Sequence, residues 1–216
     1  MRLFLDTASI DEVRRFARLG VISGVTTNPS LLAKEGGVSY RDRIREIACV
    51  VDGPISAECV SRKADDLVAE ARELASWHPN VVVKIPLDEE GLEAISRCSS
   101  EGIKINTTLI FSPNQALLAA LAGATFLSPF VGRIDDVSYD GIELIRQCVQ
   151  IMKIHDLKAQ VLAASIRHPL HVVQSALAGA HVATIPPSVF PQLLKHPLTD
   201  IGIDRFLADA RTAGLI

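Results

Sequence analysis

VVVKIP, at residues 81–86, is a short β-branched run with the composition of a buried strand and one charged residue inside it. Seven other segments are similarly apolar and β-branched. The eight runs are 3–6, 24–28, 55–60, 81–85, 104–109, 125–131, 159–165 and 181–185. Helical patterns lie between them. Strands that alternate with helices form a parallel sheet through right-handed crossovers, so this order predicts an α/β fold.

The helical pattern consists of apolar residues at spacings of three and four, as on the buried face of a helix. The clearest such segments are 65–75, 90–98, 114–121, 140–154 and 169–178. Eight strand–helix units close naturally into a (β/α)8 TIM barrel, and 216 residues leave about 27 per unit, near the lower limit for this fold. A flavodoxin-like open sheet is the alternative, but it needs only about five or six strands. We expect a single barrel domain, residues 1–216, with a C-terminal helix.

The composition argues against several classes of protein. With 22 Lys and Arg against 25 Asp and Glu residues, general nucleic-acid binding has little electrostatic support. The four cysteines form no short-spaced pair, which speaks against a disulfide framework or a zinc site. No apolar run approaches the ~20 residues of a membrane span, and the N-terminus lacks the apolar core of a signal peptide. We expect a cytoplasmic protein that acts on small molecules, without nucleic-acid or membrane partners.

Polar side chains gather where the predicted strands end, which is the rim that carries the active site in such barrels. Residues two apart on a strand share a face, so these side chains would project into the barrel. The candidates are Asp6, Thr26, Asn28, Glu58, Lys84, Asn106, Thr108, Ser128, Arg133, Ser165 and Arg167. Any one of them alone could be a satisfied core residue or a helix cap, as Asn28 before Pro29 would be. Their corresponding positions on seven of the eight runs predict a site.

Lys84 is the sharpest of these signals, because lysine is almost never fully buried without a reason. It is either a snorkelling or ion-paired lysine or a nucleophile. A pKa shift of about three units down from ~10.4 would leave about a third of the amine neutral at pH 7. Burial therefore favours a Schiff-base nucleophile, although Asp6 and Glu58 nearby would raise the pKa again. Such a lysine among acids and hydroxyls suits carbon–carbon bond chemistry.

Candidates for phosphate binding follow the sixth and seventh runs. Ser165 and Arg167 stand at a helix start, where backbone N–H groups favour anions. Arg133 could supply a second guanidinium, unless it forms a surface ion pair with Asp135 or Asp136.

Metal and cofactor sites have weak signals. His168 and His171 are three residues apart on a predicted helix, but no third ligand accompanies them, so we expect no metal. The glycine pair at 36–37 lacks the lysine and hydroxyl residues of a nucleotide-binding loop. No cofactor is expected.

Seven motifs, in this order, resemble the transaldolase family, specifically its small single-barrel branch that also contains fructose-6-phosphate aldolase. They are LFLDTA at 3–8, GVTTNPSL at 24–31, VKIP at 83–86, NTTLIFS at 106–112, SPFVGR at 128–133, ASIR at 164–167 and HPLTD at 196–200. Any one would be weak evidence. Together they run nearly end to end and are highly specific.

The resemblance implies a role for each candidate. Lys84 would form a Schiff base with a ketose phosphate, and Asp6 would take the proton from the C4 hydroxyl as the C3–C4 bond breaks. Glu58 and Thr108 would hold a water that relays protons. The substrate-binding set would comprise Thr26, Asn28, Asn106, Ser128 and Phe130 around the dihydroxyacetone unit, and Arg133, Ser165 and Arg167 around the phosphate.

Glu58 and Phe130 favour transaldolase, because fructose-6-phosphate aldolases resemble each other in having Gln and Tyr there. A phenol near the enamine can help protonate it, whereas a phenyl ring cannot, so the enamine waits for an aldehyde acceptor. The expected reaction transfers dihydroxyacetone from sedoheptulose 7-phosphate or fructose 6-phosphate to glyceraldehyde 3-phosphate or erythrose 4-phosphate, in the non-oxidative pentose phosphate pathway. The alternatives are an aldolase that releases dihydroxyacetone and a non-catalytic sugar-phosphate binder, which would need neither Asp6 nor Lys84.

The C-terminal stretch 201–207 is more apolar than a solvated terminal helix should be. It could pack on its own barrel. Small members of the family resemble rings of pentamers and decamers in which this helix packs on a neighbour, so the resemblance implies a homo-oligomer of that kind.

Overall fold

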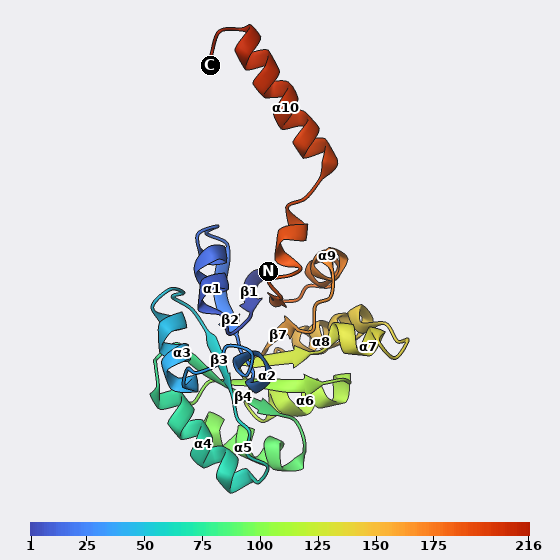
Figure 1. Ribbon diagram of the computed structural model, residues 1–216. Coiled ribbons are helices and arrows are strands. Elements are labelled where there is room, and N and C mark those ends of the chain that lie inside the picture. Colours follow the sequence, from blue (N-terminus) through green and yellow to red (C-terminus); the bar gives the residue numbers. More distant parts are fainter.

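Eight parallel strands close into a barrel in chain order in the computed structural model, which describes residues 1–216 (Figure 1). They are β1 (Arg2–Asp6), β2 (Ile22–Thr26), β3 (Ile55–Glu58), β4 (Val81–Pro86), β5 (Ile105–Ile110), β6 (Phe126–Pro129), β7 (Gln160–Ala163) and β8 (Val182–Ile185). The barrel closes where β8 pairs with β1, with Ile185 opposite Leu5. Each predicted run overlaps one strand, so the TIM barrel is confirmed and the open sheet is wrong.

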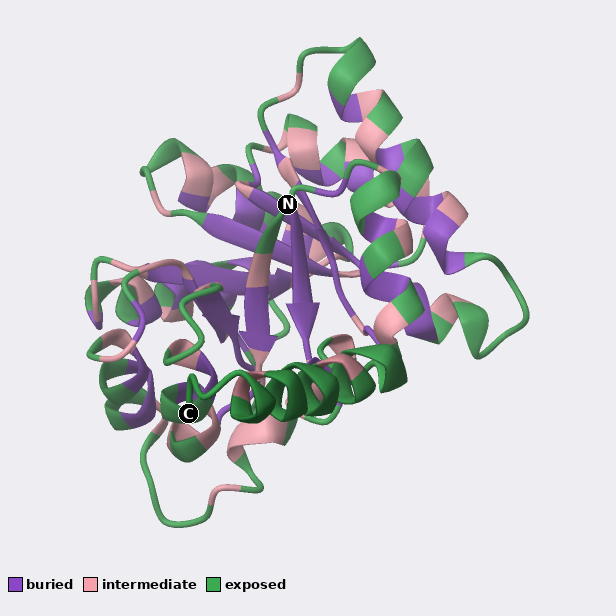
Figure 2. Ribbon diagram, turned by 90° about the horizontal axis from the view of Figure 1, so that it is seen from above, coloured by how far each residue is buried: buried purple, intermediate pink, exposed green.

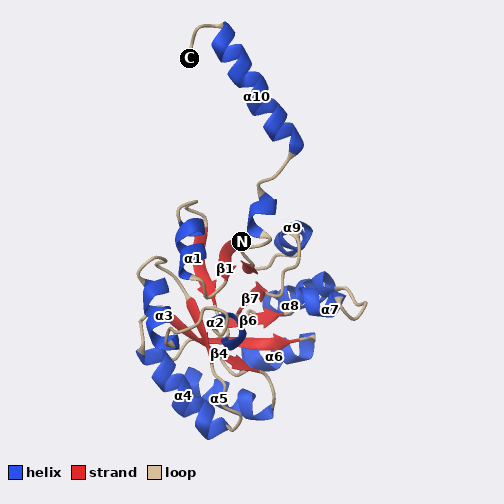
Figure 3. Ribbon diagram, in the orientation of Figure 1, coloured by secondary structure: helices blue, strands red, loops and turns tan.

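Most of the helices surround the strands on the outside of the barrel (Figure 3). The helices of the chain are α1 (Ile10–Ala17), α2 (Pro29–Leu32), α3 (Tyr40–Ala48), α4 (Ala64–Ser76), α5 (Glu89–Ser100), α6 (Pro113–Leu121), α7 (Val131–Asp135), α8 (Gly141–Ile154), α9 (Pro169–Leu177) and α10 (Pro197–Thr212), with a 3-10 helix, η1 (Phe190–Leu193). The five predicted helical segments coincide with α4, α5, α6, α8 and α9. None of the helices combines the length and the apolar character needed to cross a membrane.

The strands are the most deeply buried part of the chain (Figure 2). Their outward side chains pack against the helices, and a second, smaller cluster fills the inside of the barrel. This inner cluster consists of Phe4, Val82, Phe126, Leu162, Ala164 and Val182. Gly24 is required beside it, because a Cβ there would lie 2.6 Å from the ring of Phe4. Two residues further along the same strands, Asp6, Lys84 and Ser128 share this inward face above an apolar floor.

The helix α10 extends away from the barrel (Figure 1), and none of its residues is buried. Its start is well defined, since Pro197 occupies the first turn and the side chain of His196 accepts a hydrogen bond from the N–H of Leu198. Ile201 and Phe206 are 62% and 73% exposed. The apolar stretch expected at 201–207 is therefore present, but it does not pack on its own barrel.

Candidate active site

A cavity of about 560 Å³ opens at the C-terminal ends of the strands. All but one of the predicted site residues line it. They are Asp6, Thr26, Asn28, Glu58, Lys84, Thr108, Ser128, Phe130, Arg133, Ser165 and Arg167. The alternation of side chains along each strand is what brings residues so distant in sequence to one rim. The lining also includes Ser30, Leu31, Lys34 and Thr184, which the sequence patterns did not indicate.

Lys84 and Glu58 occupy directly opposed positions on β4 and β3. Nζ of Lys84 lies 2.8 Å from Oε2 of Glu58, and Lys84 is only 6% exposed. The ion pair compensates the burial of both charges. The ion-paired lysine left open by the sequence is therefore present, and it lies in the cavity, where the carboxylate is within reach of a proton on the amine.

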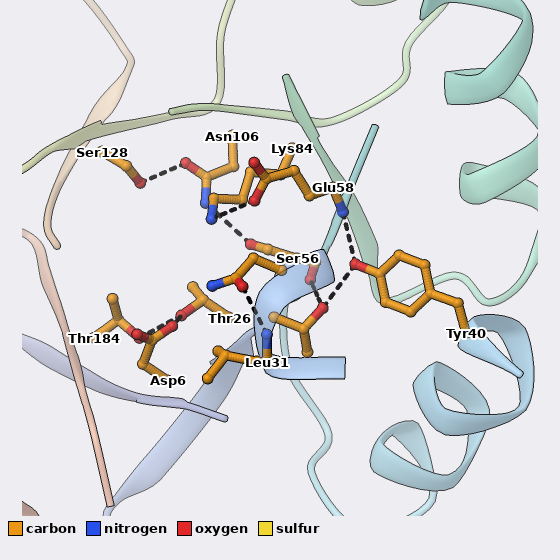
Figure 4. A network of polar contacts seen from close by, with 12 residues as sticks. Asp6, Thr26, Leu31, Tyr40, Ser56, Glu58, Lys84, Asn106, Ser128 and Thr184 are labelled. Atoms are coloured by element: carbon orange, nitrogen blue, oxygen red, sulfur yellow. Dashed lines mark hydrogen bonds and ion pairs between the residues drawn. The ribbon is translucent and has the colours of Figure 1, made fainter. Parts of the chain in front are cut away.

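Asp6 lies at the end of β1 and accepts a 2.6 Å hydrogen bond from Oγ1 of Thr26. Since Thr26 uses its only hydroxyl proton there, Thr184 must be the donor in the 2.6 Å contact between the two threonines. Burial raises the pKa of Asp6, although Lys84 and Thr26 partly offset the effect. This carboxylate therefore binds a proton more readily than a solvated aspartate. Figure 4 shows the two hydrogen bonds that link Thr184 through Thr26 to Asp6.

Thr184 belongs to β8, the one strand from which no site residue was predicted. Its signal was present in the sequence, because it lies two residues after the inward-facing Val182. The rule that identifies the other rim residues therefore applies to Thr184 as well, although it was not among the predicted residues.

Asn106 is the predicted residue that does not line the cavity. It is completely buried, accepts a 2.7 Å hydrogen bond from Ser128 and donates one of 3.0 Å to Oγ of Ser56 (Figure 4). These two bonds determine the orientation of its amide. In this structure Asn106 therefore positions Ser128, whose hydroxyl lies in the lining.

Tyr40, on α3, supports Glu58 from outside the barrel (Figure 4). Its hydroxyl accepts a 2.8 Å hydrogen bond from the backbone N–H of Glu58. Thr27 donates to the carbonyl of Ser56, so the phenol must donate in its 2.8 Å contact with Thr27. Burial raises the pKa of Tyr40 to about 12, so the phenol keeps its proton. No strand-end pattern indicated this residue.

Asn28 has both roles that its sequence position allowed. Its side chain accepts a 2.9 Å hydrogen bond from the N–H of Leu31 and so caps α2, with Pro29 in the first turn. It also lines the cavity. Because the cap uses the amide oxygen, the NH2 group remains as a donor.

The other side of the cavity carries two guanidinium groups. Arg133 lies over the ring of Phe130, 4.8 Å from its centroid. The ion pair with Asp136 that was considered for Arg133 is formed by Arg167 instead, at 2.8 Å. Ser165 has a φ of 58°, in the left-handed region that non-glycine residues rarely adopt. Such strained positions are typical of ligand-binding turns.

The cavity therefore combines a buried amine and two carboxylates on one side with two guanidinium groups on the other. An amine beside a proton acceptor can attack a carbonyl carbon, and guanidinium groups suit a phosphate. No cluster of three or more His, Cys, Asp or Glu side chains has the arrangement of a metal site.

Comparison with known proteins gives a consistent picture. Residues 3–214 match the family model described as Transaldolase/Fructose-6-phosphate aldolase. A relative from Heliobacterium modesticaldum, named "Probable transaldolase", is 60% identical over 209 residues, which are 97% of this chain and 97% of the relative. Relatives of the same name from Symbiobacterium thermophilum and a Thermoanaerobacter species are 58% and 56% identical. These alignments cover 99% and 100% of this chain, and 98% and 99% of the relatives.

Proposed function

The chain belongs to the transaldolase/fructose-6-phosphate aldolase family, and we propose that it is a transaldolase that transfers a dihydroxyacetone unit between sugar phosphates through a Schiff base on Lys84. The donors would be fructose 6-phosphate or sedoheptulose 7-phosphate, and the acceptors erythrose 4-phosphate or glyceraldehyde 3-phosphate. These are substrates of the non-oxidative pentose phosphate pathway. The observation that carries the proposal is the buried Lys84–Glu58 pair in one cavity with Asp6.

The first step forms the iminium. Lys84 passes a proton to the neighbouring Glu58, and the free amine attacks C2 of the ketose. The resulting carbinolamine loses water, so that a C=N bond replaces the C=O bond. Thr108 lines the same cavity, and its buried hydroxyl has no hydrogen-bond partner in the protein, which supports a role for Glu58 and Thr108 in holding the water that carries these protons.

The second step breaks the carbon–carbon bond. Asp6 takes the proton of the C4 hydroxyl, C4 becomes an aldehyde carbon, and the C3–C4 bonding electrons move into the iminium to give an enamine. Fructose 6-phosphate would thus release glyceraldehyde 3-phosphate. In the reverse direction the enamine attacks the acceptor aldehyde, and Asp6 returns the proton. The raised pKa of Asp6 supports this role, because it makes the carboxylate a better proton acceptor.

The remaining residues would bind and orient the substrate. Asn28, Ser128 and Thr26 would surround the dihydroxyacetone unit, with Asn106 behind Ser128. On the opposite side Arg133, Ser165 and Arg167 would bind the phosphate. Guanidinium groups suit this role because they match the oxygens of a phosphate with paired N–H donors.

Phe130 supports transfer over release. Its ring packs edge-on against Phe111, with centroids 5.6 Å apart, and lies under Arg133. It brings no hydroxyl to the cavity, so it cannot assist protonation of the enamine. An aldolase that releases free dihydroxyacetone remains the second candidate, because the same enamine would form in both reactions.

We further propose that the chain forms a homo-oligomer in which α10 of one subunit packs on the next, and the family resemblance suggests a pentamer or decamer. Such an assembly is supported by the exposure of α10. Its exposed apolar residues are Leu198, Ile201, Ile203, Phe206 and Leu207. Burial of these residues against a second copy would remove a large apolar surface from water.

Borohydride reduction tests the proposed function directly. The protein is mixed with fructose 6-phosphate, reduced, digested and examined by peptide mass spectrometry. A reduced adduct on Lys84 is expected. The absence of an adduct on any peptide, in a protein that is folded by circular dichroism, would contradict both enzymatic candidates and favour the non-catalytic binder.

A further inference from the structure

The two loops that carry the cavity's guanidinium groups are joined to each other by several contacts. The N–H of Gly132, in α7, donates a 3.0 Å hydrogen bond to the carbonyl of Ser165. A Cβ on Gly132 would lie 2.3 Å from that carbonyl and 2.5 Å from Cγ of Arg167, so only glycine permits this approach. The ion pair between Arg167 and Asp136 adds a further link at the surface.

A histidine lies beneath this junction. His171, on α9, is 3% exposed. Its Nδ1 accepts a 3.2 Å hydrogen bond from the backbone N–H of Arg167, and its Nε2 lies 2.7 Å from Oδ2 of Asp135. Since Nδ1 is an acceptor, the ring proton of neutral His171 must be on Nε2, where it is donated to Asp135. Asp135 is held in turn by the N–H of Gly141, 2.9 Å from its Oδ1.

The imidazole therefore connects the two phosphate-side loops through both of its nitrogens. One bond goes to the backbone of the turn that contains Ser165 and Arg167, and the other to the end of α7, which contains Arg133. No other side chain accepts a hydrogen bond from the N–H of Arg167. The bond is partly shielded from solvent, and a donor that loses its partner there is left poorly paired, so this turn depends on His171 for its conformation.

We propose that His171 is a positioning residue for the phosphate side of the site, which fixes the turn of Ser165 and Arg167 against α7 so that Arg133 and Arg167 act together on one phosphate. The inference rests on the proposed function, because it assigns the phosphate of the substrate to this side of the cavity. His171 itself does not line the cavity. It acts through the backbone of Arg167.

Protonation of the imidazole would break this arrangement, because a proton on Nδ1 would face the N–H of Arg167. The groups that face His171 are the ring of His168, whose centroid is 3.7 Å away, Asp135, and Arg167. Burial, and then the charge of His168, lower the pKa of His171, whereas Asp135 opposes the effect. The neutral, connected form therefore predominates at neutral pH, and the turn loosens in more acidic solution.

Two substitutions separate the two bonds. In His171→Gln the amide reaches the place of Nε2 and can still donate to Asp135, but nothing replaces Nδ1. In His171→Asn the amide oxygen takes the place of Nδ1 and can still accept from Arg167, but the bond to Asp135 is lost. His155→Gln, on an exposed histidine at the end of α8, is the matched control.

The experiment measures the inhibition constant of inorganic phosphate and the KM and kcat for fructose 6-phosphate in the full-length protein. We expect His171→Gln to weaken the binding of phosphate about tenfold and to raise KM by a similar factor, with kcat within about twofold of the unmodified protein. His171→Asn should retain more of the phosphate affinity, and His155→Gln all of it. Unchanged phosphate affinity in His171→Gln would overturn the proposal, as would a fall in kcat with KM and phosphate affinity unaltered.

A direct binding measurement keeps this test separate from the proposed function. Calorimetric titration with sulfate, whose charge is constant between about pH 5 and 8, needs no turnover. The variant lacks the imidazole of His171, whereas His168 is present in both proteins. Sulfate affinity of the unmodified protein, divided by that of His171→Asn, should therefore fall as the pH is lowered. A ratio independent of pH would contradict the proposal. If the protein lacks transaldolase activity but the ratio falls, the proposed function is wrong and the positioning role stands.

Discussion

Nζ of Lys84 lies 2.8 Å from Oε2 of Glu58, and the two side chains are only 8% and 15% exposed. They extend from opposed positions on neighbouring strands. Loss of one partner of a buried pair leaves the other charge uncompensated. The same contact gives the amine a carboxylate to which it can pass a proton before it attacks a carbonyl.

Glu58→Gln should therefore slow the formation of the iminium. We expect the rate of borohydride-trappable adduct formation to fall about 10- to 100-fold, in the lower range of general acid–base effects. Glu90→Gln is the control, because Glu90 forms a 2.8 Å pair with a lysine, Lys63, that is 73% exposed. Equal rates in Glu58→Gln and Glu90→Gln would contradict the proposed proton transfer.

Asp6→Asn should separate the two chemical steps. The adduct on Lys84 should still form, because the amine and Glu58 are intact, whereas carbon–carbon cleavage should fall about 10²- to 10⁴-fold without its proton acceptor. Since burial raises the pKa of Asp6, the acidic limb of kcat against pH should lie above the ~3.9 of an ordinary aspartate. Stopped-flow cleavage assays and mass spectrometry measure the two steps. Loss of the adduct together with cleavage would place Asp6 in the first step instead.

The same pKa shift has a consequence for stability. Because the folded chain binds the proton of Asp6 more tightly than the unfolded chain, stability falls as the pH rises from the ordinary aspartate value to the raised one. Relative to the unmodified protein, Asp6→Asn should therefore gain stability between pH 4 and pH 7. Urea unfolding at the two values measures the difference, and a relative loss over that interval would mean that the partners of Asp6 outweigh its burial.

Tyr40→Phe should affect the site from outside the barrel. The ring stays, but the N–H of Glu58 loses its acceptor and Thr27 loses a donor. The expected cost is about 1–3 kcal/mol of folding free energy, as for a buried polar group left unpaired, together with a lower kcat. Tyr139→Phe is the control, because Tyr139 is 74% exposed. Urea unfolding and steady-state kinetics measure these two effects. Equal unfolding free energies and equal kcat values in Tyr40→Phe and Tyr139→Phe would contradict this role.

Phe130→Tyr should shift the partition of the enamine from transfer toward release. The new hydroxyl would lie in the cavity and could assist protonation. Dihydroxyacetone release from fructose 6-phosphate, measured without and with erythrose 4-phosphate, should rise selectively in the absence of acceptor. Phe111→Tyr places the same group on the adjoining ring, which does not line the cavity. Substantial release by the unmodified protein without acceptor would favour the aldolase.

Phe206→Glu should weaken assembly without affecting the fold of the barrel. Phe206 is 73% exposed on α10, a helix with no buried residue that extends away from the barrel (Figure 1). If α10 packs on a second copy, a charge at this position costs apolar burial across the interface. Light scattering should show an oligomer for the unmodified protein and smaller species for the variant. Monomers in both would leave α10 without the proposed role.

The order of strands and helices was predictable because each unit has a local pattern. Short β-branched runs, and apolar residues at spacings of three and four, can be recognised in a sequence without any knowledge of distant contacts. The first and last residues of the strands and helices were less predictable. The run 24–28 was expected to be one strand, but β2 ends at Thr26 because Asn28 caps α2 and Pro29 begins it. The end of the strand depends on whether the side chain of Asn28 caps the helix or the backbone continues as β2.

The site was predictable where a residue lies two positions beyond an inward apolar residue. That rule places Lys84 after Val82 and Asp6 after Phe4, and applied to β8 it would also have found Thr184. The rule fails for Tyr40, because Tyr40 lies on a helix and Glu58 on a strand, and no shared spacing in the sequence relates the two residues.

The amino-acid sequence alone established the barrel, the family resemblance and eleven of the twenty residues that line the cavity, because strand periodicity determines side-chain direction. Tertiary structure decided the partners: that Glu58 meets Lys84, that Asn106 lies behind Ser128, and that Arg167 pairs with Asp136 while Arg133 lies over Phe130. It also connected His171 to Arg167 and Asp135, which the spacing of the histidines did not indicate. Hydrogen bonds and ion pairs depend on distances of a fraction of an ångström between remote residues, and no local pattern in a chain encodes them.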